Sequence, residues 1–212
     1  IVNDDFEATV EIDRNDIEDD NIGIYKPQAQ MAGESSKQWP DDLVFTTLTG
    51  GFTEKCYDQN TFYATNHEVG EGKTKKLVSN RLDVALNADT LAGAKASYGK
   101  ARTMMRSMKD NEGRPLNLNP NLLVVPPALE DVANALMTVD KLEDGKPNPY
   151  KGTAKVLVVG WLATDTEWHL LDASKAIKPI IYQPRKKPIF VQQTDTSSDA
   201  VFMRKKFKFG AE

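Results

Sequence analysis

Apolar and polar side chains alternate along the first residues of the chain. The apolar positions fall on every second residue with polar ones between them, namely Phe6, Ala8, Val10 and Ile12 against Glu7, Thr9 and Glu11. A period of two is typical of a β-strand with one solvated face. The sequence therefore predicts a strand that leads directly into a long helix-compatible stretch.

The stretch from Ile12 to Phe52 predicts a long helix with few large apolar side chains. Carboxylates crowd its beginning, where the free N–H groups of a helix favour negative charge, and Pro27 fits a first-turn position. Gly50–Gly51 is a strong stop signal, whereas Pro40 predicts either a kink or a break with a restart. The large apolar residues that share a face lie in the second half, at Leu43, Val44 and Leu48. We expect a strut that is apolar only where a sheet or another subunit covers it.

The next helix has the clearest pattern in the chain. Its apolar residues recur at alternating spacings of three and four, at Leu91, Ala94, Tyr98, Ala101, Met105 and Met108. This spacing gives one helical stripe, for which core packing is the favoured role. A helix start is expected at Asn87–Asp89 and an end near Gly113.

Short elements are predicted for the second half of the chain. Leu122–Val125 is typical of a buried strand, Pro127 of a helix start, and 140–152 of a polar loop. Further strands are expected at Lys155–Leu162, Trp168–Leu171, Pro179–Tyr182, Ile189–Gln192 and Ala200–Phe209. Because helices come first and strands later, without regular alternation, the fold class expected is α+β.

Charge is distributed unevenly although the net charge is only −4. Acidic residues gather between Asp4 and Asp20, and basic ones at 185–187 and 204–208. These tracts are either two solvated faces or complementary surfaces that meet within or between copies of the chain. The small net charge does not favour a nucleic-acid-binding or membrane-binding protein.

Cys56 is the only cysteine, which excludes an intrachain disulfide and fits a reducing compartment. The longest apolar runs, Leu122–Val125 and Val156–Ala163, are too short to cross a bilayer. We see no signal peptide. Because the chain starts at Ile1 in what resembles the middle of a strand, we expect it to be a fragment whose N-terminal part is missing.

Candidate chemistry is sparse. One cysteine and two histidines, His67 and His169, provide too few ligands for a typical zinc site. Cys56 and His67 form a nucleophile–base pair only in principle, since nothing around Cys56 supports it. Gly72–Thr74 matches the end of a phosphate-binding loop, but the motif requires a glycine at position 67, where this sequence has His67. Residues 64–76 are expected to form a plain loop. No catalytic, metal or cofactor site is predicted.

Several long segments nevertheless match a known family in order. They are FEATVEIDRNDIEDDNIGIYKPQAQMAGES, PDDLVFTTLTGGFTEKCYD, LLDASKAIKPIIYQPRKKPIFV and AVFMRKKFKFGAE. The chain resembles the major head subunit family of Mu-like phages and prophages over almost its whole length. The resemblance implies the Hong-Kong-97-type coat fold and a structural protein rather than an enzyme.

The family resemblance also implies a layout. Residues 1–12 would be the returning strand of the extended loop, and 13–115 the peripheral domain with its long spine helix and long strands. Residues 116–184 would be the axial domain, a small mixed sheet with flanking helices, and 185–212 the return strands to the peripheral domain.

The implied function is that of a shell subunit of an icosahedral head. Its partners would be copies of itself in hexamers and pentamers, scaffold or protease and portal proteins during assembly, and packaged double-stranded DNA without sequence readout. It would need no cofactor and no membrane, and it would be assembled in the bacterial cytoplasm and reside in the virion.

Cross-subunit ion pairs are the site-level hypothesis. We expect acidic residues near the start of the chain to contact basic residues near its end in a neighbouring subunit; these are Asp16, Glu18, Asp19 and Asp20 on one side and Arg185, Lys186 and Lys187 on the other. Each exposed pair contributes only about 0.2–1 kcal/mol, but closed symmetry repeats it.

Three alternatives stay open on the sequence alone. The first is an encapsulin-like nanocompartment shell with the same fold. The second is a soluble α+β enzyme with an unrecognised site at Cys56 and His67, and the third is a nucleic-acid-binding module that uses the C-terminal lysines, against which the overall acidity argues.

Overall fold

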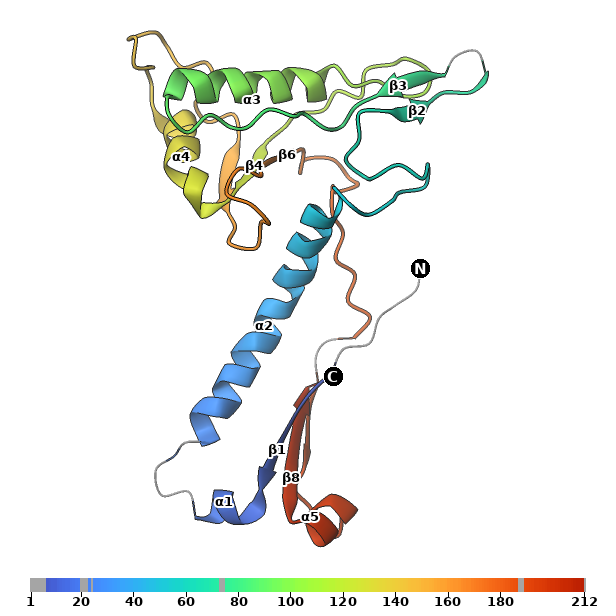
Figure 1. Cartoon of the computed structure of the whole chain (residues 1–212), viewed down its shortest axis with the longest axis vertical. Coiled ribbons are helices and arrows are strands. Elements are labelled where there is room, and N and C mark those ends of the chain that lie inside the picture. Colours follow the sequence, from blue (N-terminus) through green and yellow to red (C-terminus); the bar gives the residue numbers. More distant parts are fainter. Residues whose placement is uncertain (1–6, 20–22, 24, 73–74, 187–188, 212) are drawn as a thin grey trace. The chain divides into compact units, whose positions relative to one another are not determined.

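The computed structural model describes residues 7–19, 23, 25–72, 75–186 and 189–211 (Figure 1). Helices and strands are mixed along the chain, in agreement with the α+β prediction. The chain divides into two compact units, one formed by Ile1–Leu43 with Tyr182–Glu212 and the other by Val44–Ile181. The predicted boundary between 115 and 116 falls inside the second unit.

The first unit contains an antiparallel sheet in the order β1–β8–β7. Its strands are β1 (Ala8–Asp13), β8 (Lys206–Ala211) and β7 (Phe190–Gln193). β1 pairs with β8 in the register Ala8↔Ala211 through Asp13↔Lys206, so the described ends of the chain lie side by side. The predicted strands at 6–12 and 189–192 are confirmed within the described residues, while Phe6 lies outside them.

The predicted strand over 200–209 is wrong in its first half. Helix α5 (Asp199–Arg204) precedes β8, and Lys205 between them adopts a φ of 51°. The Lys205 amide donates to the Val201 carbonyl at 3.1 Å, and Val201 is buried. The alternation of apolar and basic residues at 200–209 is compatible with a strand. The structure instead forms a short helix at 199–204, which buries Val201.

Helix α2 (Tyr25–Gly50) continues through Pro40, so of the two predicted alternatives, a kink or a break, the break is excluded. The first-turn position of Pro27 and the end at Gly50 are confirmed. One proline removes a single backbone hydrogen bond. The part of α2 after it is held in the second unit, where Phe45 and the buried Leu48 join a hydrophobic cluster.

The second unit is built on a sheet in the order β5–β4–β6. β4 (Leu122–Val125) is parallel to β5 (Lys155–Val158) and antiparallel to β6 (His169–Leu171). Side chains of a strand point to opposite faces in turn. Leu123 and Val125 accordingly pack in one core, while Val124 packs in a second core with Leu48.

Two helices cover the first of these faces (Figure 1). α3 (Leu91–Arg106) begins after the N-cap Thr90, whose hydroxyl accepts from the Gly93 amide, and buries Ala94 and Tyr98. A short 3₁₀ turn, η2 (Pro127–Leu129), leads into α4 (Glu130–Thr138). β4 and η2 confirm the predictions at 122–125 and 127, and α3 confirms the helix from Leu91, although it ends at Arg106, before the predicted end near Gly113.

Three predictions in the second unit fail in whole or in part. The strand expected at Lys155–Leu162 ends at Val158. The expected loop at 64–76 contains β2 (His67–Val69), which forms an antiparallel hairpin with β3 (Lys76–Val78). The strand expected at 179–182 is absent from the described residues, because Ile181 and Tyr182 are exposed and Ile180 alone packs on the second core.

Candidate functional site

The predicted acidic contact residues lie at the end of β1 in the first unit. Asp16 and Glu18 belong to α1 (Arg14–Glu18), and Asp19 follows it; the side chains of all three are exposed. Glu18 accepts from the Arg14 guanidinium at 2.8 Å. Asp20 lies outside the described residues.

The predicted basic contact residues belong to the same unit. Arg185 and Lys186 are exposed, and Lys187 lies outside the described residues. Among the residues that the structure describes, the ion pair that involves the acidic set is the local one between Glu18 and Arg14. Contact between the two sets across subunits therefore stays a prediction.

Other members of the acidic and basic tracts meet within the chain. Glu11 on β1 contacts Lys208 at 2.7 Å and Lys206 at 3.4 Å on the neighbouring strand β8. Hydrogen bonding from Lys208 is the main reason that the pKa of Glu11 is lowered. At these residues the charge tracts are complementary surfaces, as one of the two sequence interpretations expects, and they hold the β1–β8 register.

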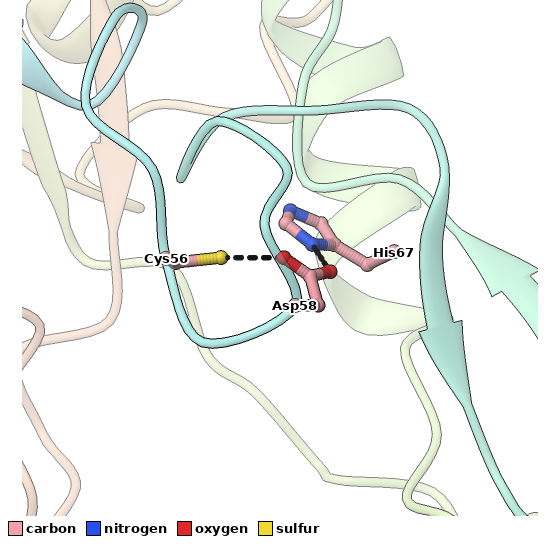
Figure 2. A group of neighbouring side chains, drawn as sticks. All are labelled: Cys56, Asp58 and His67. Atoms are coloured by element: carbon pink, nitrogen blue, oxygen red, sulfur yellow. Dashed lines mark hydrogen bonds and ion pairs between the residues drawn. The ribbon is translucent and has the colours of Figure 1, made fainter.

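A cluster of three polar side chains stands in the second unit, in the segment between α2 and β2 (Figure 2). The Cys56 thiol donates to Asp58 Oδ1 at 2.9 Å, and His67 Nδ1 lies 2.6 Å from Asp58 Oδ2. His67 Nε2 lies 3.0 Å from the Phe62 carbonyl oxygen. The side chains of Asp58 and His67 are only 11% and 12% exposed.

Asp58 sets the protonation of both neighbours. Hydrogen bonds from Cys56 and then from His67 lower the pKa of Asp58. The hydrogen bond to Asp58 is the main cause that raises the pKa of the Cys56 thiol and also that of His67. Both nitrogens of His67 face acceptors, which favours the doubly protonated imidazolium.

This arrangement differs from a nucleophile–base pair. A catalytic cysteine needs a lowered pKa and a basic partner for its proton. Here the imidazole faces Asp58, and the thiol donates to the same carboxylate, which opposes thiolate formation. The geometry thus gives no support to the enzyme interpretation that rests on Cys56 and His67.

The second histidine also pairs with a carboxylate. His169 Nε2 lies 2.8 Å from Glu167 Oε1, and both side chains are buried. Glu167 further accepts from the Thr49 hydroxyl at 3.0 Å and the Ala163 amide at 3.2 Å. Burial is the main cause that lowers the pKa of His169, which disfavours the charged imidazolium at this position.

A groove of about 870 Å³ lies beside this pair in the second unit. Its lining includes Phe52, Trp161 and Trp168 together with the backbone end of α2 at Gly50. Glu167 in its wall already accepts three hydrogen bonds. The described part of this wall holds carboxylates and threonines but neither histidine nor cysteine.

Two further sequence observations concern a phosphate loop and a membrane span. Gly72 follows the β2 strand, while Lys73 and Thr74 lie outside the described residues. Within the part of the chain that the structure describes, no helix combines the length and apolar character needed to cross a bilayer.

The fold is that of a phage capsid protein. A chain of the bacteriophage JBD30 capsid superposes with a TM-score of 0.62 and 25% identity, over 74% of this chain and 74% of that one. The JBD30 capsid decorated with minor capsid protein trimers gives a TM-score of 0.58 at 28% identity, with coverage of 74% and 73%. The JBD30 procapsid gives 0.57 at 28% identity, with coverage of 74% and 75%.

The sequence model of the family described as Mu-like prophage major head subunit gpT matches residues 1–92, 84–162 and 163–212, and the chain belongs to this family. It is 31% identical over 215 residues to the Mu-like prophage FluMu major head subunit of Haemophilus influenzae. It is 29% identical over 211 residues to the major capsid protein of Escherichia phage Mu. All of this chain matches in each case, but it spans only 46% of either relative.

Proposed function

We propose that this chain is a shell-forming part of the major capsid protein of a Mu-like phage or prophage. The complete protein that carries it assembles with its own copies into hexameric and pentameric capsomers of an icosahedral head. The observation that carries the proposal is the family match along the whole chain, together with the capsid fold of its structural neighbours.

In this proposal α2 is the spine helix of a Hong-Kong-97-type coat fold. β1 serves as the returning strand of the extended loop and pairs with the return strand β8 in the peripheral domain, which their register supports. The mixed sheet of β4, β5 and β6 serves as the centre of the axial domain. α3 belongs with that sheet instead of the peripheral domain, because Tyr98 and Leu123 share one core.

The proposal also fixes the kind of partner. A shell subunit needs self-complementary edges rather than a catalytic centre. Its main partners are copies of itself, and scaffold or protease and portal proteins act during assembly in the bacterial cytoplasm. The finished virion encloses double-stranded DNA that the subunit does not read by sequence.

Electron microscopy of the complete protein, expressed alone and together with its neighbouring genes, tests the proposal. We expect closed shells with five-fold and six-fold capsomers. Monodisperse monomers under both conditions would contradict a shell role. Genes for a portal, a terminase or a head protease beside this one would separate a phage head from an encapsulin-like compartment.

A further inference from the structure

The Cys56–Asp58–His67 cluster has a ligand set that the proposed shell function does not use. Thiolate, carboxylate and imidazole are the three kinds of protein ligand that zinc takes. One ligand atom from each residue lies within 4.8 Å of the other two. We propose that these residues bind a divalent transition-metal ion of the zinc class.

The distances suit a tetrahedral ion. Bonds of about 2.0–2.3 Å place ligand atoms roughly 3.4–3.6 Å apart. The hydrogen-bonded atoms at 2.9 Å and 2.6 Å must separate slightly, and no pair begins beyond 4.8 Å. An ion between the side chains of Figure 2 therefore requires the separations of the ligand atoms to change by only about 1 Å.

His67 is oriented as a metal ligand would be. A metal-bound histidine usually donates its other ring N–H to a carbonyl or carboxylate, which fixes the tautomer. The Phe62 carbonyl oxygen lies 3.0 Å from His67 Nε2 and so directs Nδ1 toward Cys56 and Asp58. Asn80 donates to the same carbonyl at 2.6 Å and holds it in position.

The backbone positions the other two ligands before any ion arrives. The Cys56 amide donates to the Asn60 carbonyl at 2.8 Å, and the Asn60 amide donates to Asp58 Oδ1 at 3.1 Å. His67 is fixed in the β2–β3 hairpin opposite Val78. The ion would join the turn after α2 to this hairpin and so act as a structural cross-link.

Binding must release protons. The Cys56 thiol loses one proton to form the metal–sulfur bond, and His67 binds through an Nδ1 that carries no proton, so a proton on that nitrogen is lost as well. Both protons pass to solvent, and a water molecule completes the coordination. Affinity should therefore rise with pH. The soft sulfur ligand should favour zinc over magnesium and calcium.

Cobalt(II) absorption tests the site without any substitution. Because Cys56 is the only cysteine, a sulfur-to-cobalt charge-transfer band in the purified chain can arise only from this residue. We expect one equivalent of Co²⁺ to produce the band, Zn²⁺ to abolish it and Mg²⁺ to leave it unchanged. No band at pH 8 would overturn the proposal.

Calorimetric titration with Zn²⁺ then tests the contribution of Asp58 alongside that of Cys56. Cys56→Ser and Asp58→Asn should each weaken binding at least about tenfold. Asp83→Asn is the matched control, because Asp83 also pairs with a cation, Arg81, but lies outside the cluster; it should bind as the unsubstituted chain does. Equal binding by all variants would show an adventitious ion only. This outcome is independent of shell assembly.

Discussion

A single carboxylate, Asp58, determines the character of the Cys56 cluster. It accepts from the Cys56 thiol on one oxygen and lies 2.6 Å from His67 Nδ1 with the other, and these contacts raise the pKa of both neighbours. Without it, Cys56 and His67 would be chemically suited to act as a nucleophile and base. Cys56 and His67 stand out in the sequence as candidate residues, whereas Asp58 does not, because an aspartate two residues after a cysteine carries no signal until the turn at 56–60 forms.

The two histidines should respond to pH in opposite ways. The raised pKa of His67 means that its contribution to stability is complete below its unfolded pKa of about 6.5 and is lost as pH rises through the folded value. The lowered pKa of His169 means that stability falls as the unfolded state takes up a proton near pH 6.5. His67→Gln should therefore make stability fall more steeply from about pH 7.5 to 5.5.

Urea denaturation at several pH values, in the presence of a chelator, measures how steeply the free energy of unfolding changes with pH. His169→Gln is the matched control and should make the same slope shallower. An unchanged pH dependence in His67→Gln would show that the contact with Asp58 is not an ion pair in solution.

At the scale of elements, burial decides whether a segment with an ambiguous sequence pattern forms a helix or a strand. The strand at 122–125 and the helix at 91–106 are strongly periodic and pack in one core, so prediction and structure agree. Residues 199–204 and 67–69 have weak or ambiguous patterns. The helix at 199–204 buries Val201, and the strand at 67–69 depends on pairing with 76–78 across a loop. Helix α2 continues through Pro40 because Phe45 and Leu48, which follow it, pack in a hydrophobic cluster.

Glycines in the two long helices provide a matched test of helix energetics. A Cβ added at Gly33 in α2 meets nothing within 4 Å. Gly33→Ala should therefore stabilise the helix by about 0.5–1 kcal/mol, since alanine loses less backbone entropy. Amide hydrogen exchange in α2 should become about two- to five-fold slower, which is the same free energy expressed as a rate ratio.

Gly93→Ala in α3 is the control. Its Cβ would lie 2.5 Å from Asn87 Cγ, and that side chain accepts from the Asp89 and Thr90 amides ahead of the helix. We expect no gain or a loss of protection in α3. Faster exchange in α2 of Gly33→Ala would contradict the view that this part of the helix is open.

For the whole molecule, charge is the feature most closely tied to assembly. The acidic and basic tracts already meet inside the first unit at Glu11, Lys206 and Lys208. Arg185 and Lys186 remain exposed in the same unit. An exposed pair is worth only about 0.2–1 kcal/mol, so its effect becomes measurable when a closed shell repeats it many times.

Reversing the basic set to glutamate in the complete protein tests the cross-subunit pairs. Arg185→Glu, Lys186→Glu and Lys187→Glu together should reduce assembly most strongly at low salt, where screening is weakest. Light scattering against salt concentration gives the readout. Reversal of the exposed Lys100, Lys109 and Lys141 is the control. Adding Asp16→Lys, Glu18→Lys, Asp19→Lys and Asp20→Lys to this variant should restore assembly. Unchanged assembly of the variant with only the basic set reversed would rule out the pairing.

The sequence by itself determined the α+β class, the long helix ending at Gly50, the strongly periodic elements and the family. These follow from local periodicity, from stop signals and from long ordered motifs, none of which needs a distant partner. Only the tertiary structure decided the β1–β8 register, the β2–β3 hairpin and the meeting of Cys56, Asp58 and His67. Those features depend on contacts between residues far apart in the chain or on the closure of one turn, and side-chain spacing alone does not encode which groups will meet.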